Sequence, residues 1–295
     1  MEPILEGKVA LITGSSSGIG KALAIGFARL GANIILTGRN QDRLIFTQNL
    51  IIQEGRKALV ISGNVENYTE VKNVIDRGIS EFKKIDILIN NAGFSRLKPI
   101  TRFRVEEFDM ILKTNVIGPY NYTHAIVPHM IESGGGTIIN TGTVAIKVPM
   151  PKWSAYAMSK GALNTFTEFI ATELKEYDIT INTIMLNMVD TPLFRLGLDE
   201  EKVKALNPMD PNLLVPYFAF FATPDASKYT GFNVDIDIVK QVLALREKLP
   251  EEKKSDADWS SIQEIAEQTM DSKEFREVRK IKKLISFLMK DQIIS

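Results

Sequence analysis

Tyr156 and Lys160 stand four residues apart in the segment WSAYAMSK, and this pair can do acid–base chemistry. On a helix, side chains at this spacing lie on the same face. A tyrosine hydroxyl can exchange a proton with a reacting oxygen, but its ordinary pKa of about 10 is poorly matched to neutral pH. A nearby lysine ammonium favours the phenolate and would lower that pKa. The pair therefore predicts proton transfer at an oxygen, although many such pairs simply lie on helix surfaces.

A glycine-rich segment, TGSSSGIG at residues 13–20, offers a place for a phosphate group. Its glycines permit a tight turn, close approach of backbone N–H groups to a pyrophosphate, and a helix whose positive N-terminal end faces the phosphates. The pattern alone is weak evidence, because a turn between a strand and a helix needs glycine anyway. The residues of this segment that we expect at a cofactor are Gly14, Ser16, Ser17, Gly18, Ile19 and Gly20.

Strand-like and helix-like runs alternate along most of the chain. The run KVALIT at residues 8–13 is short and continuously apolar, as in a buried strand of a parallel sheet. IGKALAIGFARLG follows it, with apolar residues at helical spacing and a glycine at its end. Further strand-like runs are NIILT, ALVIS, DILIN, TIINT, ITINTIM and NVDIDIV. The pattern predicts an α/β fold, a single Rossmann-type doubly wound parallel sheet with helices on both faces.

Composition argues against several kinds of site and partner. The chain has 295 residues, with 36 Lys and Arg against 36 Asp and Glu, so no net charge attracts nucleic acid or a membrane. It has no cysteine and only two histidines, which predicts neither disulfides nor a metal site. We recognise no secretory signal and no apolar run long enough to span a membrane, so we expect a cytoplasmic protein.

Three motifs occur together, in a characteristic order and at characteristic separations: TGxxxGxG from Thr13, NNAG from Asn90, and the Tyr156–Lys160 pair. Together they resemble the classical short-chain dehydrogenase/reductase family, over about residues 8–238. The resemblance implies a Rossmann-type domain and a nicotinamide cofactor. It also implies interconversion of a carbonyl group and an alcohol on a small-molecule substrate.

The same resemblance implies four catalytic residues. Tyr156 is the acid and base, and Lys160 lowers its pKa and can bond the ribose of the cofactor. Thr143 takes the place of the family's serine, which holds the substrate oxygen; threonine keeps the hydroxyl but adds a methyl group that restricts χ1. Asn115 matches the asparagine that supports a proton relay. Thr141 stays an alternative to Thr143, because residues two apart in a strand share a face.

The segment ILTGRNQDR, after the second strand, bears on which cofactor is bound. NAD sites hold the adenosine ribose with an acidic residue there, whereas this chain has Gly38 followed by Arg39. An arginine can pair with a 2′-phosphate through its planar guanidinium, so we expect NADP(H). An exposed Arg39 without a ligand is the alternative, and Arg43 is a second candidate. The resemblance also puts Asn64, Val65, Asn91, Ala92, Gly93, Val189 and Thr191 at the cofactor.

The end of the chain departs from the family pattern. We expect residues 1–240 to form the dinucleotide-binding and catalytic domain, and residues 241–295 a charged, mostly helical extension. The run SKEFREVRKIKKLISFLMKDQIIS predicts one amphipathic helix with a broad apolar face. That face could dock on its own domain, which we favour, or lie on an anionic membrane. The family resemblance implies a homodimer through helices at residues 115–132 and 154–177, or a homotetramer.

The sequence leaves two functions open. The first is an NADP(H)-dependent oxidoreductase that interconverts a ketone, or a 3-ketoacyl group, and a secondary alcohol by hydride transfer. The second is an NADPH-binding scaffold or sensor with weak or no turnover, which acts through its C-terminal helix. The complete motif set favours the first, while threonine in place of serine and the C-terminal extension motivate the second.

Overall fold

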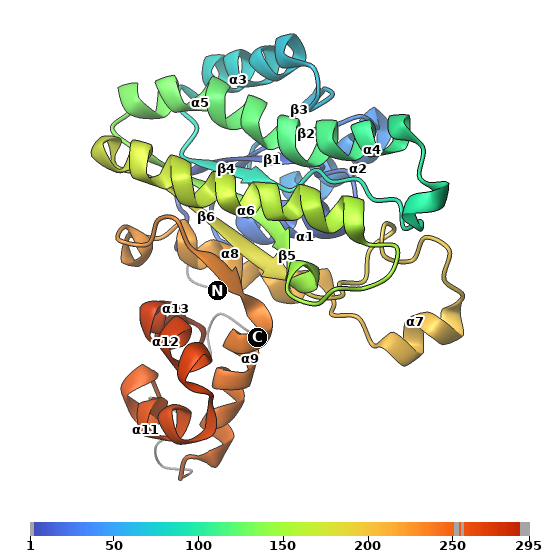
Figure 1. Ribbon diagram of the computed structural model, residues 1–295. Coiled ribbons are helices and arrows are strands. Elements are labelled where there is room, and N and C mark those ends of the chain that lie inside the picture. The colour runs from blue at the N-terminus through green and yellow to red at the C-terminus, as the bar shows by residue number, and fades with distance from the viewer. Residues whose placement is uncertain (1–2, 251–253, 255–256, 290–295) are drawn as a thin grey trace.

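The computed structural model describes residues 3–250, 254 and 257–289. Within them, seven parallel strands form one sheet in the order β3-β2-β1-β4-β5-β6-β7, so the expected doubly wound fold is confirmed (Figure 1). Chain order reverses between β1 and β4, which is where such sheets bind their ligands. The strands are β1 (Val9–Thr13), β2 (Asn33–Gly38), β3 (Ala58–Ser62), β4 (Ile87–Asn90), β5 (Gly136–Thr143), β6 (Ile179–Leu186) and β7 (Asn233–Asp235).

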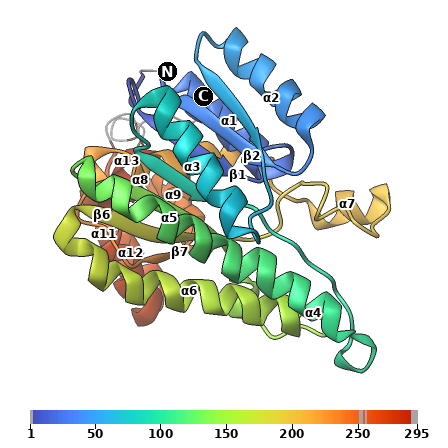
Figure 2. The same ribbon diagram turned by 90° about the horizontal axis from the view of Figure 1, so that it is seen from above.

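Helices cover both faces of the sheet (Figure 1, Figure 2). One face carries α3 (Tyr68–Phe82), α4 (Val105–Leu112), α5 (Gly118–Glu132) and α6 (Ser154–Leu174). The opposite face carries α1 (Gly18–Arg29), α2 (Gln41–Gln53) and α8 (Val215–Phe221). A short helix, α7 (Glu200–Leu206), projects from the long connection after β6 (Figure 1).

Strand β1 shows why the sheet needs helices on both faces. Val9 and Leu11 belong to the hydrophobic cluster under α3 and α5, and Ala10 and Ile12 belong to the cluster under α1 and α8. Successive side chains of a strand point to opposite faces, so a continuously apolar strand is stable only when both faces are covered. All five residues of β1 are accordingly buried.

A single π-helical turn, Lys113–Ile117, joins α4 to α5. Asn115 lies in this turn and is fully buried. Gly118 follows it, and a Cβ there would lie only 2.7 Å from a methyl group of Val65. The glycine therefore allows the distorted helix to lie against the loop after β3, and the distortion aims the asparagine inward. Such π turns are frequent at functional sites.

The end of the C-terminal extension, where the sequence predicts one amphipathic helix, is divided into α12 (Ser272–Lys280) and α13 (Lys282–Leu288). Before these two helices come α9 (Ile236–Ala244), which begins ahead of residue 241, and α11 (Trp259–Thr269). Ile281 separates α12 from α13 with non-helical backbone angles, φ −111° and ψ 23°. One straight helix would extend beyond the core. The break lets both short helices pack their apolar sides into it. Residues 290–295 of the expected helix lie outside the described residues.

The last expected strand is also shorter than its apolar pattern predicts. β7 ends at Asp235, whose side chain accepts a 2.9 Å hydrogen bond from the backbone N–H of Asp237 and so caps α9. The run DIDIV therefore changes from strand to helix at a capping aspartate, a signal that its alternating pattern hides. The predicted domain boundary at residue 240 falls inside α9, and the division into two parts stays a prediction.

The extension docks on the dinucleotide-binding fold, as favoured from its sequence. The rings of Phe220 in α8 and Phe287 in α13 lie 5.3 Å apart, and the Tyr229 hydroxyl accepts a hydrogen bond from the backbone of Lys283. The expected apolar face is buried, so it is not available to a lipid surface in this fold. Among the described residues, none of the helices has the length and apolar character that crossing a membrane requires.

Candidate active site

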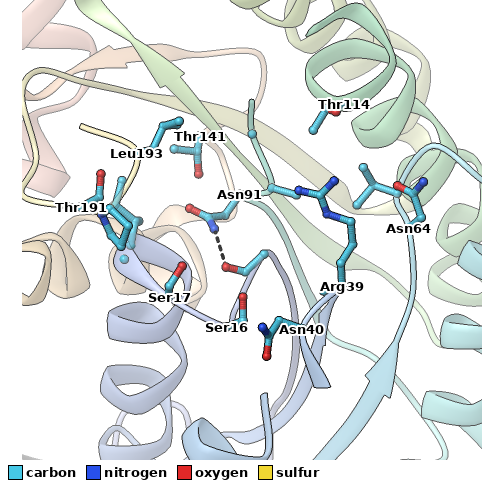
Figure 3. Close-up of a pocket in the computed structure, with 18 of the residues that line it drawn as sticks. Ser16, Ser17, Arg39, Asn40, Asn64, Asn91, Thr114, Thr141, Thr191 and Leu193 are labelled. Atoms are coloured by element: carbon cyan, nitrogen blue, oxygen red, sulfur yellow. Dashed lines mark hydrogen bonds between the residues drawn. The ribbon is translucent and has the colours of Figure 1, made fainter. Parts of the chain in front are cut away.

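A cleft of about 560 Å³ lies at the carboxyl ends of the central strands (Figure 3). The loops after β1, β2, β3 and β4, the β5 residue Thr141 and the start of α6 all line it. Most of the cofactor residues expected from the sequence meet there: Gly14, Ser16, Ser17, Gly18, Ile19, Arg39, Asn64, Val65, Asn91, Ala92, Gly93, Tyr156, Lys160 and Thr191. One cavity therefore joins the phosphate loop to the tyrosine and lysine.

Several residues that line this cleft are missing from the expected set. They include Asn40, next to Arg39, and Glu66, which accepts a 2.7 Å hydrogen bond from the hydroxyl of Thr114. Their signal in the sequence is proximity, because Asn40 follows Arg39, Glu66 follows Val65 and Thr114 precedes Asn115. Gly38 and Arg43, the second candidate from the sequence, line the cleft as well. Pro192 and Leu193, directly after Thr191, also line the cleft. Gly20, Asn115, Thr143 and Val189 are expected residues that do not line it.

The phosphate loop requires glycine for steric reasons. Gly14 and Gly18 have positive φ angles of 66° and 53°, which side chains rarely adopt. A Cβ on Gly14 would lie 2.9 Å from the backbone of Ala92, and one on Gly20 would lie 2.5 Å from the Asn91 amide. The loop can therefore approach the end of β4 only without side chains. This leaves a cradle beside the N-terminus of α1, as a pyrophosphate needs.

Hydrogen bonds fix the loop after β4 against the phosphate loop. The Thr13 hydroxyl accepts from the backbone N–H groups of Asn91 and Ala92 at 2.9 and 3.0 Å. The Asn91 side chain donates back to the carbonyl oxygens of Thr13 and Gly14, the second of these bonds being drawn in Figure 3. The motif NNAG thus holds two strand ends together and keeps the floor of the cleft narrow.

Arg39 extends into the cleft at its other end (Figure 3). Among the described residues, no carboxylate lies within ion-pair distance of its guanidinium. Gly38 precedes it, and the side chain of Asn40 caps α2 by accepting from the backbone of Arg43. Arg39 thus directly precedes a capped helix start, and its charge, without a carboxylate partner in the described part of the chain, suits an anionic ligand group.

Tyr156 and Lys160 occupy the first two turns of α6. The Lys160 ammonium lies 6.0 Å from the centre of the tyrosine ring and donates a 2.7 Å hydrogen bond to the carbonyl oxygen of Thr141. Burial lowers the pKa of Lys160 to about 8 and raises the pKa of Tyr156 to about 12. In the protein alone, burial therefore outweighs the expected effect of the lysine, and the tyrosine hydroxyl keeps its proton at neutral pH.

Asn115 is held by the loop after β4 and by α6. Its Oδ1 accepts from the backbone N–H of Phe94 at 2.8 Å, and its Nδ2 donates to the Phe94 carbonyl and to the Ser159 hydroxyl. A Cβ on Gly93 would lie 3.7 Å from Asn115 Oδ1 and 4.0 Å from the Lys160 ammonium. Glycine thus leaves a space that borders both groups, and a water molecule there could bridge them.

The hydroxyl of Thr143 is already engaged within the protein. It donates to the Leu186 carbonyl at 3.2 Å and accepts from the backbone N–H of Ala145 at 3.3 Å. Thr141 lies two residues earlier on the same face of β5, and its side chain lines the cleft. The structure thus brings the alternative threonine, rather than the expected one, to the cavity with Tyr156 and Lys160.

The glycine cradle, Arg39 and the pair of half-buried Tyr156 and buried Lys160 fit a nicotinamide dinucleotide. Comparison with known proteins agrees. A family model described as short chain dehydrogenase matches residues 8–201. The 3-oxoacyl-(acyl-carrier-protein) reductase FabG of Thermotoga maritima is 30% identical over 249 residues, which cover 79% of this chain and 97% of that protein. The chain therefore belongs to the short-chain dehydrogenase family, whose members are oxidoreductases that bind a nicotinamide cofactor and act on small molecules.

Solved structures support the same assignment. The 3-ketoacyl-(acyl-carrier-protein) reductase of Brucella melitensis, complexed with NADH, superposes with a TM-score of 0.73 at 30% identity, over 79% of this chain and 97% of that one. A short chain dehydrogenase of Burkholderia cenocepacia in complex with NADP gives a TM-score of 0.73 at 29% identity, over 78% and 96% of the two chains. Similar folds thus hold either cofactor, and the choice depends on the residues of each cleft.

The pKa of Lys160 predicts how cofactor affinity depends on pH. Burial lowers this pKa from 10.5 to about 8, so the ammonium is present below pH 8 and is lost as the pH rises through 8. An ammonium that bonds the cofactor makes the Kd for NADPH rise above pH 8, by up to about tenfold per pH unit. Fluorescence titration from about pH 7 to about pH 9.5 measures this. Lys160→Met should bind more weakly with no such dependence, and a flat wild-type profile would contradict the assignment.

Proposed function

We propose that the protein is an NADP(H)-dependent oxidoreductase that interconverts a ketone, or a 3-ketoacyl group, and a secondary alcohol. The observation that carries the proposal is the single cleft, which contains the phosphate cradle, Arg39, Tyr156 and Lys160. The names of the Thermotoga and Brucella relatives support a 3-ketoacyl substrate class. The cytoplasmic location expected from the sequence stays a prediction.

The bound cofactor supplies or accepts the hydride. In the reducing direction Tyr156 gives its proton to the substrate oxygen, for which a hydroxyl that stays protonated at neutral pH is suited. Lys160 places a positive charge near the phenolate that remains, and opposite charge favours the ionised form. In the oxidising direction Tyr156 must first be a phenolate, which the same charge favours, and the phenolate then accepts the proton of the alcohol.

Asn115 and Gly93 supply a route for the returning proton. A water molecule that enters the space beside Gly93 would border the Asn115 carbonyl oxygen and the Lys160 ammonium. The asparagine orients this water, because its own amide is fixed by Phe94 and Ser159. Lys160 can then return a proton toward the tyrosine after each turnover. Asn115 in this account is a positioning residue.

A scaffold or sensor with weak turnover is the second candidate function. The hydrogen bond that the Thr143 hydroxyl donates to the Leu186 carbonyl oxygen favours this second function. The hydroxyl has one proton, so it cannot also donate to a substrate oxygen. The Thr143 side chain must turn before it can take the role of the family's serine. The cofactor would then serve as the recognised ligand, and the docked extension as a surface for partners.

The direct test compares wild type with Tyr156→Phe. Oxidation of NADPH is followed with ketones and 3-ketoacyl thioesters, and NADPH binding is titrated in parallel. The variant should lose about 100- to 10,000-fold in turnover, because it lacks the proton donor, while its Kd for NADPH changes little. Turnover that survives the substitution would contradict the proposed role of Tyr156. Tight NADPH binding without any wild-type turnover would favour the scaffold.

Gly38 and Arg39 support a preference for NADP(H). A guanidinium without an acidic partner can pair with the 2′-phosphate, and glycine in the preceding position adds neither bulk nor negative charge. A Cβ on Gly38 would lie 3.7 Å from both Leu44 and Ser16, which is ordinary contact distance. A larger residue therefore fits here without moving the backbone, so the preference can be tested by substitution.

Gly38→Asp should reverse the cofactor preference. The new carboxylate repels the 2′-phosphate of NADPH and can accept hydrogen bonds from the ribose hydroxyls of NADH. We expect the Kd for NADPH to rise about 10- to 100-fold and the Kd for NADH to fall. Gly38→Asn is the control, since it adds nearly the same volume without the charge. Equal weakening of both cofactors by Gly38→Asp would contradict the assignment.

A second copy of the chain is the proposed partner of the α4–α5–α6 face. Large apolar side chains stand exposed along it, including Tyr120 (49%), Met158 (50%) and Phe169 (69%). Exposed large apolar side chains gathered on neighbouring helices favour an interaction site. These helices are the ones expected to form a homodimer, while the extension lies at the β7 end of the sheet, on the far side from α3 (Figure 1). A homotetramer stays a prediction.

Phe169→Asp should weaken the dimer, because a charge at a buried contact must lose its hydration. Sedimentation velocity over a range of concentrations should show a shift from about twice 33.0 kDa toward 33.0 kDa. We expect the dissociation constant to rise at least about tenfold. Phe46→Asp is the matched control, since Phe46 is 57% exposed on α2, away from this face. A monomeric wild type would exclude the proposed homodimer.

A further inference from the structure

Thr141 and Thr143 point to the same side of β5 but differ in their hydrogen bonding. The Thr143 hydroxyl has two partners, Leu186 and Ala145. The Thr141 hydroxyl is buried and, among the described residues, has no hydrogen-bond partner. Only 7% of the Thr141 surface is exposed, so bulk water cannot readily satisfy this hydroxyl. An unsatisfied buried hydroxyl lowers the stability of the protein. In a binding cleft, a ligand can supply the missing hydrogen bond.

The surroundings of Thr141 indicate which ligand group it meets. Its side chain lines the cleft, and Figure 3 shows its hydroxyl facing the space between Asn91 and Thr191. Its own carbonyl oxygen accepts the 2.7 Å hydrogen bond from Lys160. The neighbours of Thr141 are thus cofactor-loop residues and the lysine, at the end of the cleft opposite Arg39.

We propose that the Thr141 hydroxyl binds the nicotinamide–ribose half of the cofactor. The inference rests on the proposed function, in that it takes the ligand of the cleft to be NADP(H). With Arg39 at the 2′-phosphate end, the nicotinamide half reaches the end where Thr141 and Lys160 lie. A threonine hydroxyl can donate to a carboxamide oxygen or accept from a ribose hydroxyl, and both groups belong to this half.

The substrate oxygen is the competing partner for this hydroxyl. That oxygen must reach Tyr156, which is the proton donor. The Thr141 carbonyl oxygen lies instead beside the Lys160 ammonium, the group that the family resemblance assigns to the ribose of the cofactor. Thr141 is therefore a cofactor-positioning residue. The serine-like role stays with Thr143, whose side chain must first release Leu186.

The test compares two ligands with one isosteric substitution. Thr141→Val removes the hydroxyl and keeps the shape. We expect its Kd for NADPH to rise about 3- to 10-fold, the usual loss for one neutral hydrogen bond. The Kd for adenosine 2′,5′-bisphosphate should not change, because this fragment lacks the nicotinamide half. Arg39→Leu is the matched control and should weaken both ligands, because both carry the 2′-phosphate.

Thermal unfolding without ligand gives an independent readout. Thr141→Val should raise the Tm by roughly 2–4 °C, because it removes an unsatisfied buried hydroxyl. Thr143→Val should lower the Tm by a similar amount, because it leaves the Leu186 carbonyl and the Ala145 N–H without their partner. A Thr141→Val protein that is less stable would show that this hydroxyl has a structural partner, and would overturn the proposal.

Three binding results would also overturn it. An unchanged Kd for NADPH with a raised KM for the carbonyl substrate would assign Thr141 to the substrate. Equal weakening of NADPH and the bisphosphate would indicate a distorted cleft. No change in either ligand and no change in KM would leave the hydroxyl without a role. Because binding is measured without turnover, absence of wild-type activity would count against the proposed reaction and leave the role of Thr141 to be decided by the two Kd values.

Discussion

The close contact between the ends of β1 and β4 is the constraint on which the cleft depends. Thr13 ends β1, and its hydroxyl accepts two backbone N–H groups from the loop after β4. The contact is so tight that Gly14 and Gly20 cannot carry side chains without clashing with Ala92 or Asn91. A parallel sheet with reversed strand order opens a crevice at this point, and the threonine sets how wide it is. The position of the phosphate cradle relative to Tyr156 and Lys160 follows from that width.

Burial shifts the pKa values of Tyr156 and Lys160 in opposite directions. It moves the pKa of Lys160 down to about 8 and the pKa of Tyr156 up to about 12, because both groups lose water around their charged forms. Near neutral pH the pair therefore consists of an ammonium and a neutral phenol. This is the state from which a proton can be delivered to a carbonyl oxygen, and a cofactor that brings ribose hydroxyls to the lysine would stabilise its charge further.

Sequence patterns predicted the central fold because neighbouring residues within each strand, loop and helix determine it. The first four residues of β1 are apolar and must be covered on both faces, and Gly14 and Gly18 in the loop after it supply the positive φ angles that its turn needs. The Tyr156–Lys160 spacing likewise needs only a helix. The state of Thr143 could not be predicted in this way. Its hydroxyl reaches the carbonyl of Leu186, 43 residues along the chain, through the pairing of β5 with β6. Hydrogen bonds across strands depend on register, which a motif does not specify.

The extension shows the same limit at larger scale. The spacing of apolar residues identified which face of α12 and α13 is buried. It did not predict the break at Ile281, because helical periodicity does not describe the shape of the surface on which the helix docks.

Docking of the extension also affects the cleft. Lys147, four residues after Thr143, bonds Asp235 at 2.9 Å and lies 3.8 Å from Glu277 of α12. The segment that follows β5 is thus tied both to the end of β7 and to the extension. Residues far outside the shared family motifs therefore help to hold the segment that leads from Thr143 to Tyr156.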